Sequence, residues 1–346
     1  MRVLVAPDKF AGTLTAAEAV DAIADGWRRQ APDDVVTRLP MSDGGPGFAS
    51  VLGGAQGADR STAYIESAEY CGHGQVPGSW DGSTAAVGRA VLDAVAGGAT
   101  KVVVGLGGSA TNDGGAGFLS ALGGTADVPL DAGPAGLRGV SAVDLAGVHE
   151  ALRGVELVAA ADVDIPLLGL FGATKTFGPQ KGLSEEDLPA VDGILDDFVV
   201  AVLGAAPAER RLAEAPGAGA AGGLGFAILL AGGTVQRGVN LVADAVGLAD
   251  ACASADLVIT GEGTYDHTSR SGKVVFGVAE RAAAAARPCI VLAGQVTVGS
   301  REARAMGVDA AYAVADVVGL EGSFADPAGS LATLAERAAR TWSRQF

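Results

Sequence analysis

The chain has 346 residues, a length that predicts either two domains or one large α/β unit. Hydrophobic residues make up 49% of the chain and charged residues 18%, so we expect a folded core and exclude intrinsic disorder. The 24 basic and 40 acidic residues give a net charge of −16, which disfavours binding to the phosphate backbone of nucleic acids.

Cysteine usage and hydropathy indicate the cellular setting. Cys71, Cys252 and Cys289 are far apart and show neither a disulfide pattern nor the spacing of a metal site. No apolar run reaches the length of a membrane span, and the N-terminal residues lack the apolar stretch of a signal peptide. We therefore expect a soluble, cytoplasmic protein with no membrane or nucleic-acid partner. The sequence leaves open whether it forms a homodimer.

Several short apolar segments lead directly into polar or glycine-rich turns. Because they are apolar on both faces and contain many β-branched residues, they are typical of buried parallel strands. We expect such strands at residues 3–6, 35–39, 101–106, 157–161, 257–260 and 289–293.

Helical patterns lie between these segments. Thr15 and Glu18 have the spacing of a capping box, which predicts a helix that begins there. The alternation of strand, glycine-rich loop and helix predicts an α/β fold, in which ligands bind at the carboxyl ends of the strands. Further helices are expected at residues 84–96, 187–203, 273–286 and 331–343.

The most informative loop, residues 107–117, follows the expected strand at 101–106. It combines glycines with Ser109, Thr111 and Asn112, and with the carboxylate of Asp113. The backbone N–H groups of such a loop can surround a phosphate, while its polar side chains contact phosphate oxygens or Mg²⁺. A tight structural turn is the alternative, but a turn does not require so many polar side chains. We therefore predict phosphate binding here.

Two nucleotide-binding fingerprints fail. Lys273 follows Gly272, but His267 stands where a P-loop requires its first glycine. Residues 217–222 match the pattern G-x-G-x-x-G, yet the segment before them is polar and ends in Pro216, so no strand is expected to lead into it. The sequence therefore predicts neither a P-loop NTPase nor a dinucleotide-binding enzyme.

A second charged loop follows the expected strand at 257–260. Glu262, Asp266 and Lys273 suit metal–phosphate chemistry, although a solvated salt-bridge cluster explains them about equally well. Asp43 is a further loop carboxylate, for which a turn is the commoner explanation. The three histidines are far apart and no G-x-S-x-G motif occurs, which argues against a histidine metal centre and a serine hydrolase.

Six motifs occur in the order found in the bacterial class I glycerate kinases, and the chain resembles that family over essentially its whole length. The resemblance implies ATP- and Mg²⁺-dependent phosphorylation of D-glycerate to 2-phospho-D-glycerate. It also implies two α/β domains with the active site in the cleft between them. We place a flavodoxin-like domain, with a Rossmann-like parallel sheet, at residues 1–50 and 240–346, and the second α/β domain at residues 51–239. The motifs are Ala6-Pro-Asp-Lys-Phe10, Ser42-Asp-Gly-Gly45, Gly105–Gly117, Phe177-Gly-Pro-Gln-Lys-Gly182, Gly217–Gly225, and Ile259–Gly263 with Asp266 and Gly272-Lys273.

Residue type and loop position then suggest roles for individual side chains. Asp43 and Asp266 are expected as candidate bases for the acceptor hydroxyl, and Lys273 as the cation that neutralises the transferred group. Asp113 and Glu262 are the predicted Mg²⁺ ligands. Phosphate or nucleotide binding is predicted for Gly107, Gly108, Ser109, Thr111, Asn112 and Lys181.

The chain departs from the family pattern at several places, and we interpret it as a shortened member. Ala11 stands where lysine is usual, Ala85 and Ala86 replace a tyrosine and a glycine, and residues 54–63 form a short segment. These departures predict an open acceptor pocket, with a KM for D-glycerate above the usual range of ~1 μM–1 mM or a preference for a bulkier hydroxy acid. The alternative is a catalytically altered relative that uses another acceptor or only binds it.

Overall fold

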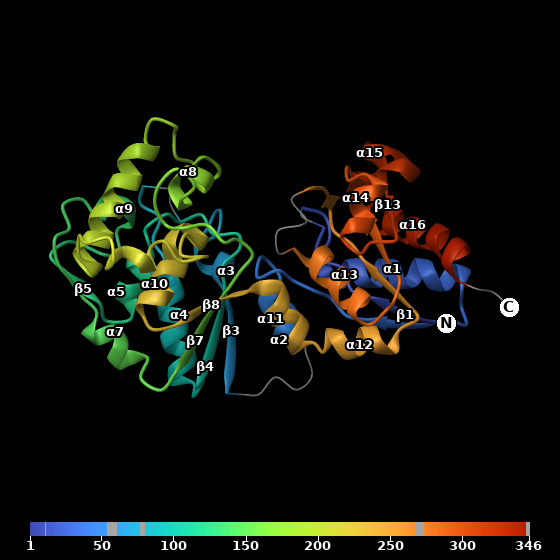
Figure 1. Cartoon of the computed structure of the whole chain (residues 1–346), viewed down its shortest axis with the longest axis horizontal. Coiled ribbons are helices and arrows are strands. Elements are labelled where there is room, and N and C mark those ends of the chain that lie inside the picture. The colour runs from blue at the N-terminus through green and yellow to red at the C-terminus, as the bar shows by residue number, and fades with distance from the viewer. Residues whose placement is uncertain (11, 54–60, 77–79, 268–272, 344–346) are drawn as a thin grey trace. The chain divides into compact units, whose positions relative to one another are not determined.

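The computed structural model describes residues 1–10, 12–53, 61–76, 80–267 and 273–343. The chain divides into two compact units: unit 1 comprises Met1–Asp43, Ser50–Gln56 and Val239–Phe346, and unit 2 comprises Gly44–Ala49 and Gly57–Gly238. Figure 1 shows the blue N-terminal helix beside the red C-terminal helix within unit 1. The short segment Gly44–Ala49 belongs to unit 2, whereas the sequence places it in the first domain.

Unit 1 is built on a five-stranded parallel sheet in the order β13-β11-β9-β1-β2. Numbered along the chain, this order is 5-4-3-1-2, which is the flavodoxin-like arrangement. The change of direction between β1 and β9 leaves the carboxyl ends of these two strands at a topological switch point. The strands are β1 (Arg2–Val5), β2 (Val35–Arg38), β9 (Leu257–Thr260), β11 (Cys289–Ala293) and β13 (Ala310–Ala313).

Helices cover both faces of this sheet. The helices α1 (Ala16–Gln30) and α16 (Pro327–Trp342) pack together over one face, where Val3, Ile259 and Leu292 join their apolar core. A Cβ at Gly26 would lie 2.0 Å from the carbonyl oxygen of Ala332, so only glycine permits this close helix contact. On the other face lie α12 (Leu248–Ser254) and α13 (Val274–Ala284). The remaining elements are α11 (Gly238–Ala245), α14 (Ser300–Ala305), α15 (Ala315–Ala325) and the strand pair β10 (Thr264–Tyr265) and β12 (Gln295–Val296).

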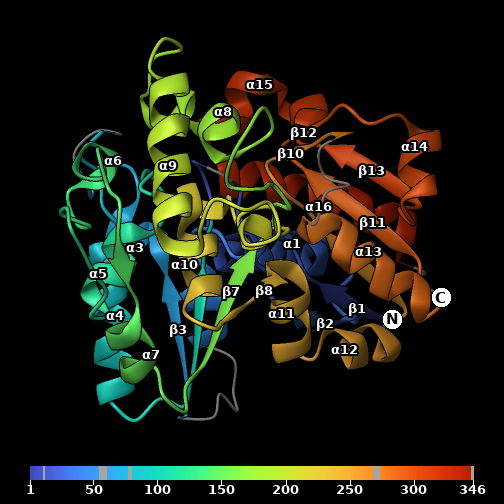
Figure 2. The same cartoon turned by 60° about the vertical axis from the view of Figure 1, so that its left-hand side comes forward.

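Unit 2 contains a four-stranded parallel sheet in the order β3-β4-β7-β8. Its strands are β3 (Thr62–Glu66), β4 (Lys101–Gly105), β7 (Glu156–Ala161) and β8 (Thr234–Arg237). The helix α4 (Ala85–Ala96) packs on β3 and β4, α10 (Leu224–Leu230) packs on β7 and β8, and α5 (Ala116–Ala121) contacts both helices. Figure 2 shows α4 and α5 beside this sheet.

The other elements of unit 2 are short, apart from one long helix. The long helix is α9 (Leu188–Leu203), which contributes Leu195 and Phe198 to the core of the unit. The short elements are α3 (Ser67–Cys71), β5 (Thr125–Ala126), α6 (Gly133–Gly136), β6 (Val143–Asp144), α7 (Ala146–Ala151), α8 (Ala173–Phe177) and the 3-10 helices Pro179–Lys181, Arg210–Leu212 and Ala220–Gly223. The first residues of α2 (Phe48–Gly53) belong to unit 2 and the remaining ones to unit 1.

The α/β fold with parallel sheets is confirmed, and each of the six expected strands is present. Thr15 caps α1 through the predicted capping box with Glu18. The last helix begins before the expected residue 331, because Asp326 caps it by accepting a hydrogen bond from the Gly329 N–H and Pro327 occupies its first turn. Among the described residues, no helix combines the length and the apolar character needed to cross a bilayer.

Candidate active site

A cavity of about 340 Å³ opens at the carboxyl edge of the unit 1 sheet. The loop after β1 contributes Asp8 and Lys9 to its wall, and the segment after β2 contributes Asp43. Glu262 follows β9, and Gln295 follows β11. The cavity therefore lies where a flavodoxin-like sheet is expected to bind its ligand, beside the switch point between β1 and β9.

Glycines allow the loops of this wall to approach one another closely. A Cβ at Gly261 would lie 2.0 Å from the carbonyl oxygen of Leu292, and a Cβ at Gly294 would lie 2.5 Å from that of Gly263. The Asp8 N–H donates to the carbonyl oxygen of Gly261 at 2.9 Å, which continues the pairing of β1 with β9 beyond the strand ends. These contacts bring Asp8 and Glu262 to the same edge of the sheet.

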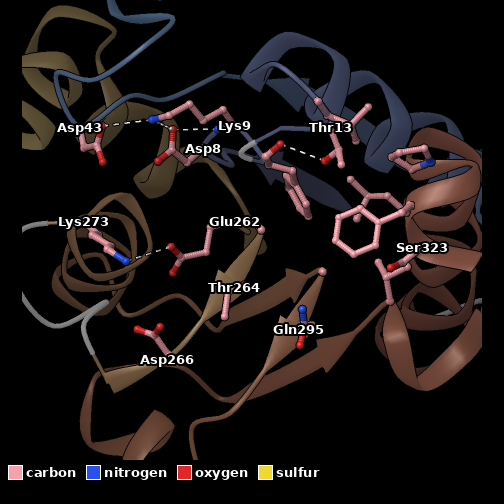
Figure 3. A pocket seen from close by; sticks show the side chains of 18 residues that line it. Asp8, Lys9, Thr13, Asp43, Glu262, Thr264, Asp266, Lys273, Gln295 and Ser323 are labelled. Carbon is pink, nitrogen blue, oxygen red and sulfur yellow. Dashed lines mark hydrogen bonds and ion pairs between the residues drawn. The ribbon is translucent and has the colours of Figure 1, made fainter. Parts of the chain in front are cut away.

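Charged side chains form one part of the cavity. Lys9 Nζ lies 3.3 Å from Asp43 Oδ1 and 3.6 Å from Asp8 Oδ1, so a single ammonium group bridges two carboxylates. Figure 3 shows these three side chains together, with Lys273 and Glu262 on the same side of the cavity. Asp266 lines the same cavity. The described wall thus carries four carboxylates and two amines.

The burial and crowding of these charges change the protonation of Asp8. The pKa of Asp8 is raised to about 7, chiefly by burial and also by the nearby carboxylates Asp43 and Glu262, against the opposing effect of Lys9. Burial lowers the pKa of Lys9, but Asp8 and Asp43 more than offset this, so that its pKa is raised overall. Asp8 is therefore a buried carboxyl group that gains and loses its proton near neutral pH, as a general base requires.

Lys273 lies on the same charged wall, at the start of α13. Its Nζ is 3.9 Å from Glu262 Oε2, at the outer limit of an ion pair. The side chain of Lys273 is 31% exposed, so it can reach a ligand in the cavity. The structure thus brings Lys273 together with Asp43, Glu262 and Asp266, which the sequence predicts as site residues.

The other part of the cavity is apolar and includes two hydroxyl groups. Thr13 Oγ1 donates to the Phe10 carbonyl oxygen at 2.9 Å, and Ser323 Oγ donates to the Leu320 carbonyl oxygen at 2.6 Å. Figure 3 shows Thr13 and Ser323 on the side of the cavity opposite to Asp43 and Lys273. The apolar wall consists of Phe10, Leu14, Val314, Phe324, Pro327 and Leu331.

The glycine-rich loop of unit 2, residues 107–117, has a different organisation. Asp113 is fully buried, and its carboxylate accepts hydrogen bonds from Thr84 N, Thr84 Oγ1, Gly115 N and Gly117 N at 2.8 to 3.2 Å. Burial raises the pKa of Asp113, although these donated bonds act in the opposite direction. The carboxylate fixes the loop to the start of α4.

Lys181 holds the same loop from another side. Its Nζ donates to Ser109 Oγ at 3.0 Å and to the Thr111 carbonyl oxygen at 2.7 Å. Burial lowers the pKa of Lys181 to about 8. Asn112 is also fully buried, and its Nδ2 donates to Thr174 Oγ1 at 3.0 Å.

The loop also packs backbone against backbone on the second glycine-rich segment. A Cβ at Gly222 would lie 2.0 Å from the Thr111 carbonyl oxygen. The Gly114 N–H donates to the Gly222 carbonyl oxygen at 2.9 Å. As expected, no strand leads into residues 217–222; among the described residues a 3-10 helix at Arg210–Leu212 precedes them.

These contacts show where the predicted phosphate and Mg²⁺ ligands of unit 2 lie. Thr111, Asn112 and Asp113 are completely buried, and the Asn112 amide nitrogen and the Asp113 carboxylate hydrogen-bond to the protein itself. Their roles as phosphate or Mg²⁺ ligands stay predictions. The Gly107 N–H is also occupied, since it donates to the Gly44 carbonyl oxygen at 3.1 Å. Among the predicted phosphate-binding residues, Gly108 is exposed, and Ser109 and Lys181 are nearly buried.

Sequence reasoning missed Asp8 as a site residue. The residue lies in the Ala6–Phe10 motif, but nothing in its sequence context distinguishes a buried carboxylate from a surface turn. Its position beside Glu262 depends on the pairing of β1 with β9, strands that are about 250 residues apart in the chain. Ala11, Gly272 and most of the short segment at 54–63 lie outside the described residues.

Comparison with known proteins places this arrangement in a family. The family model "Glycerate kinase family" matches residues 3–61 and 55–343. The chain is 36% identical to a glycerate kinase of Bacillus subtilis over 94% of this chain and 93% of the relative. It is 33% identical to a glycerate 2-kinase of Escherichia coli over 92% of both chains. The crystal structure of a proposed glycerate kinase 2 from Salmonella typhimurium LT2 superposes with a TM-score of 0.80 and 32% identity, and covers 99% of this chain and 98% of that one. The chain belongs to the glycerate kinase family.

Proposed function

We propose that the protein transfers the terminal phosphoryl group of ATP to a hydroxyl group of D-glycerate and releases 2-phospho-D-glycerate and ADP. Membership of the glycerate kinase family supports the reaction class, and the name of the Escherichia coli relative supports the 2-position. The observation that carries the proposal is the unit 1 cavity, where Lys9 and Lys273 stand among carboxylates at the sheet edge.

The cavity supplies the cations that phosphoryl transfer requires. Charge develops on the transferring group and on the leaving ADP, and fixed cations stabilise it in the transition state. Lys273 is 31% exposed and lines the cavity, which suits a lysine that contacts the transferring phosphoryl group. Lys9 is held by Asp8 and Asp43, which fixes its ammonium group in place.

Asp8 is the proposed base for the acceptor hydroxyl. The hydroxyl oxygen attacks the terminal phosphorus atom, the bond from that atom to the oxygen bridging it to ADP breaks, and the hydroxyl proton passes to the Asp8 carboxylate. Because burial and the neighbouring carboxylates raise the pKa of Asp8 to about 7, the group is ionised just above neutral pH and still basic enough to accept this proton. Asp266 lines the same cavity and is the proposed alternative.

The donor set of the cavity fits Mg²⁺. This ion prefers carboxylate oxygens and is usually held by one or two carboxylates together with substrate phosphates. Asp43 and Glu262 each raise the pKa of Asp8 by repulsion, and a cation among these carboxylates relieves that repulsion. We assign Asp43 and Glu262 as the residues that hold the ion. When bound, Mg²⁺ neutralises charge on the phosphates.

A coupled assay of ADP release over a panel of hydroxy acids tests the proposal. The panel contains D-glycerate, L-glycerate, glycolate, D-lactate and a bulkier hydroxy acid, and phosphorus NMR locates the phosphoryl group in the product. We expect D-glycerate to be the preferred acceptor with the phosphoryl group on the 2-oxygen. ADP release that no hydroxy acid stimulates would reject the proposal, and phosphorylation at the 3-oxygen would reject its regiochemistry.

A further inference from the structure

We propose that the apolar part of the unit 1 cavity binds the adenine base of ATP, with Phe324 as the stacking surface and the hydroxyl oxygens of Thr13 and Ser323 as acceptors for the exocyclic amine. The inference rests on the proposed function, because it assumes that the charged part of the cavity holds the phosphates of a nucleoside triphosphate.

The apolar side of the cavity indicates that a second ligand binds there in addition to the hydroxy acid. Glycerate carries a carboxylate and two hydroxyl groups on three carbons, so it has almost no apolar surface to place against phenylalanine, leucine and valine side chains. The cavity of about 340 Å³ is divided between a charged side and an apolar side that meet in one space. A ligand with phosphates at one end and a flat aromatic group at the other matches that division.

Phe324 has the most exposed side chain among the apolar residues that line the cavity. It lies on α15 and lines the cavity, yet it is 61% exposed. The other apolar residues of the wall are more buried, and Phe10, Val314 and Leu331 are each at most 5% exposed. An aromatic ring exposed to solvent at the edge of a cavity is a ready surface for stacking with a base.

The two hydroxyl groups favour adenine over guanine. Thr13 Oγ1 and Ser323 Oγ both donate their protons to backbone carbonyl oxygens, at 2.9 Å and 2.6 Å. A hydroxyl group that has donated its proton presents only acceptor lone pairs to a ligand. The exocyclic amine of adenine is a donor and fits this pair, whereas the carbonyl oxygen of guanine at the same ring position is an acceptor and is repelled.

The side-chain amide of Gln295 is a further group that can recognise the base. It lines the cavity at the start of β12, where it pairs with Thr264 of β10. The amide nitrogen of a glutamine side chain is a donor and can bind a ring nitrogen of adenine, while Thr13 and Ser323 accept from the exocyclic amine. Selectivity therefore comes from three polar groups on a wall that is otherwise apolar.

Calorimetric titration of the full-length protein tests the base site without relying on turnover. The ligands are ATP, GTP and inorganic tripolyphosphate, each with Mg²⁺. We expect the wild-type protein to bind ATP more tightly than GTP. Phe324→Ala is expected to weaken ATP binding about 5- to 150-fold, the range typical of a lost base–aromatic stack, and to leave tripolyphosphate binding unchanged.

One matched variant serves as a control, and a second tests the acceptors. Phe171 is 75% exposed and lies in unit 2, outside the residues that line the cavity, so Phe171→Ala is expected to leave ATP binding unchanged. Ser323→Ala removes one acceptor, which is expected to reduce the preference for ATP over GTP. Circular dichroism of each variant checks that the fold is retained.

The outcomes separate this inference from the proposed function. Equal binding of ATP and GTP, or equal weakening of ATP and tripolyphosphate by Phe324→Ala, overturns the adenine site even if D-glycerate is phosphorylated. Selective loss of ATP binding in Phe324→Ala supports the adenine site even if D-glycerate proves not to be the acceptor.

Discussion

Two polar, glycine-rich regions follow parallel strands in this molecule, and they use their polar groups in opposite ways. In unit 2, the Asp113 carboxylate accepts four hydrogen bonds from its own loop and from Thr84, and its side chain is sealed from solvent. In unit 1, the Asp8 carboxylate is buried against Lys9, and two further carboxylates raise its pKa.

The difference is the one we expect between a loop that acts as scaffold and a proposed reactive site. In the unit 2 loop, glycines let one backbone segment pack on another, and the side chains of Asp113 and Ser109 hydrogen-bond to the protein around them. In the unit 1 cavity, glycines bring loops together so that like charges face the same space. Such an arrangement costs stability unless a ligand compensates it, and perturbed carboxyl groups in a cavity are typical of catalysis.

The largest effect is expected for Asp8→Asn. The asparagine cannot accept the hydroxyl proton, so kcat should fall about 10²- to 10⁴-fold, the usual contribution of a general base. In the wild-type protein, kcat/KM should rise with pH through about 7, as Asp8 loses its proton. The variant should lose that rise. Steady-state kinetics from pH 5.5 to 9 measure both effects.

A matched control for this variant is Asp256→Asn. Asp256 accepts hydrogen bonds from Arg2 in unit 1 but does not line the cavity. The kinetics of the Asp256→Asn variant should therefore match those of the wild-type protein. An unchanged pH profile in Asp8→Asn would assign the proton transfer to Asp266 or Asp43 instead.

A smaller effect is expected for Lys273→Ala. Loss of a cation beside the transferring phosphoryl group should lower kcat on the order of 10²-fold, with a smaller change in the KM for ATP. Lys101→Ala is the control, because Lys101 pairs at the unit 2 surface with Glu156, at 2.8 Å. Equal kinetics for the two variants would reduce Lys273 to a surface lysine.

The sequence predicts the central strands of both sheets, because these strands are continuous apolar runs, such as Leu257–Thr260. It does not predict β3, β8 or β13, whose strands are only partly buried or alanine-rich, so their apolar pattern is weak. Local motifs correctly identify Glu262, Asp266 and Lys273 as neighbours, because all three follow one strand.

The remaining site features depend on contacts that no local pattern encodes. Asp8 meets Glu262 through strand pairing, and Phe324 reaches the cavity from a helix that no motif marks. Asp113 shows a second limit of local patterns. Its loop has the composition of a phosphate site, yet the direction of its side chain toward Thr84 N and Gly117 N is decided by packing.

The contrast between the two carboxylates can be tested by comparing the unfolding free energies of Asp8→Asn and Asp113→Asn at pH 8. A raised native pKa means that Asp8 contributes stability below its unfolded pKa, near 3.8, and loses it as pH rises through about 7. At pH 8 the native carboxylate is therefore destabilising, and Asp8→Asn should raise the unfolding free energy by about 1 to 4 kcal/mol.

Burial raises the pKa of Asp113 as well, so removal of its charge is favourable by itself. In Asp113→Asn, however, the new amide group must face at least one buried donor whichever way it is turned, and we expect this clash to dominate, so that the unfolding free energy falls by about 3 kcal/mol. Urea denaturation with hydrogen exchange resolved for each unit measures both variants directly. Changes of opposite sign, a gain in unit 1 for Asp8→Asn and a loss in unit 2 for Asp113→Asn, are the predicted result. A loss of stability in both variants would contradict the assignment of unit 1 as the reactive site and the unit 2 loop as scaffold.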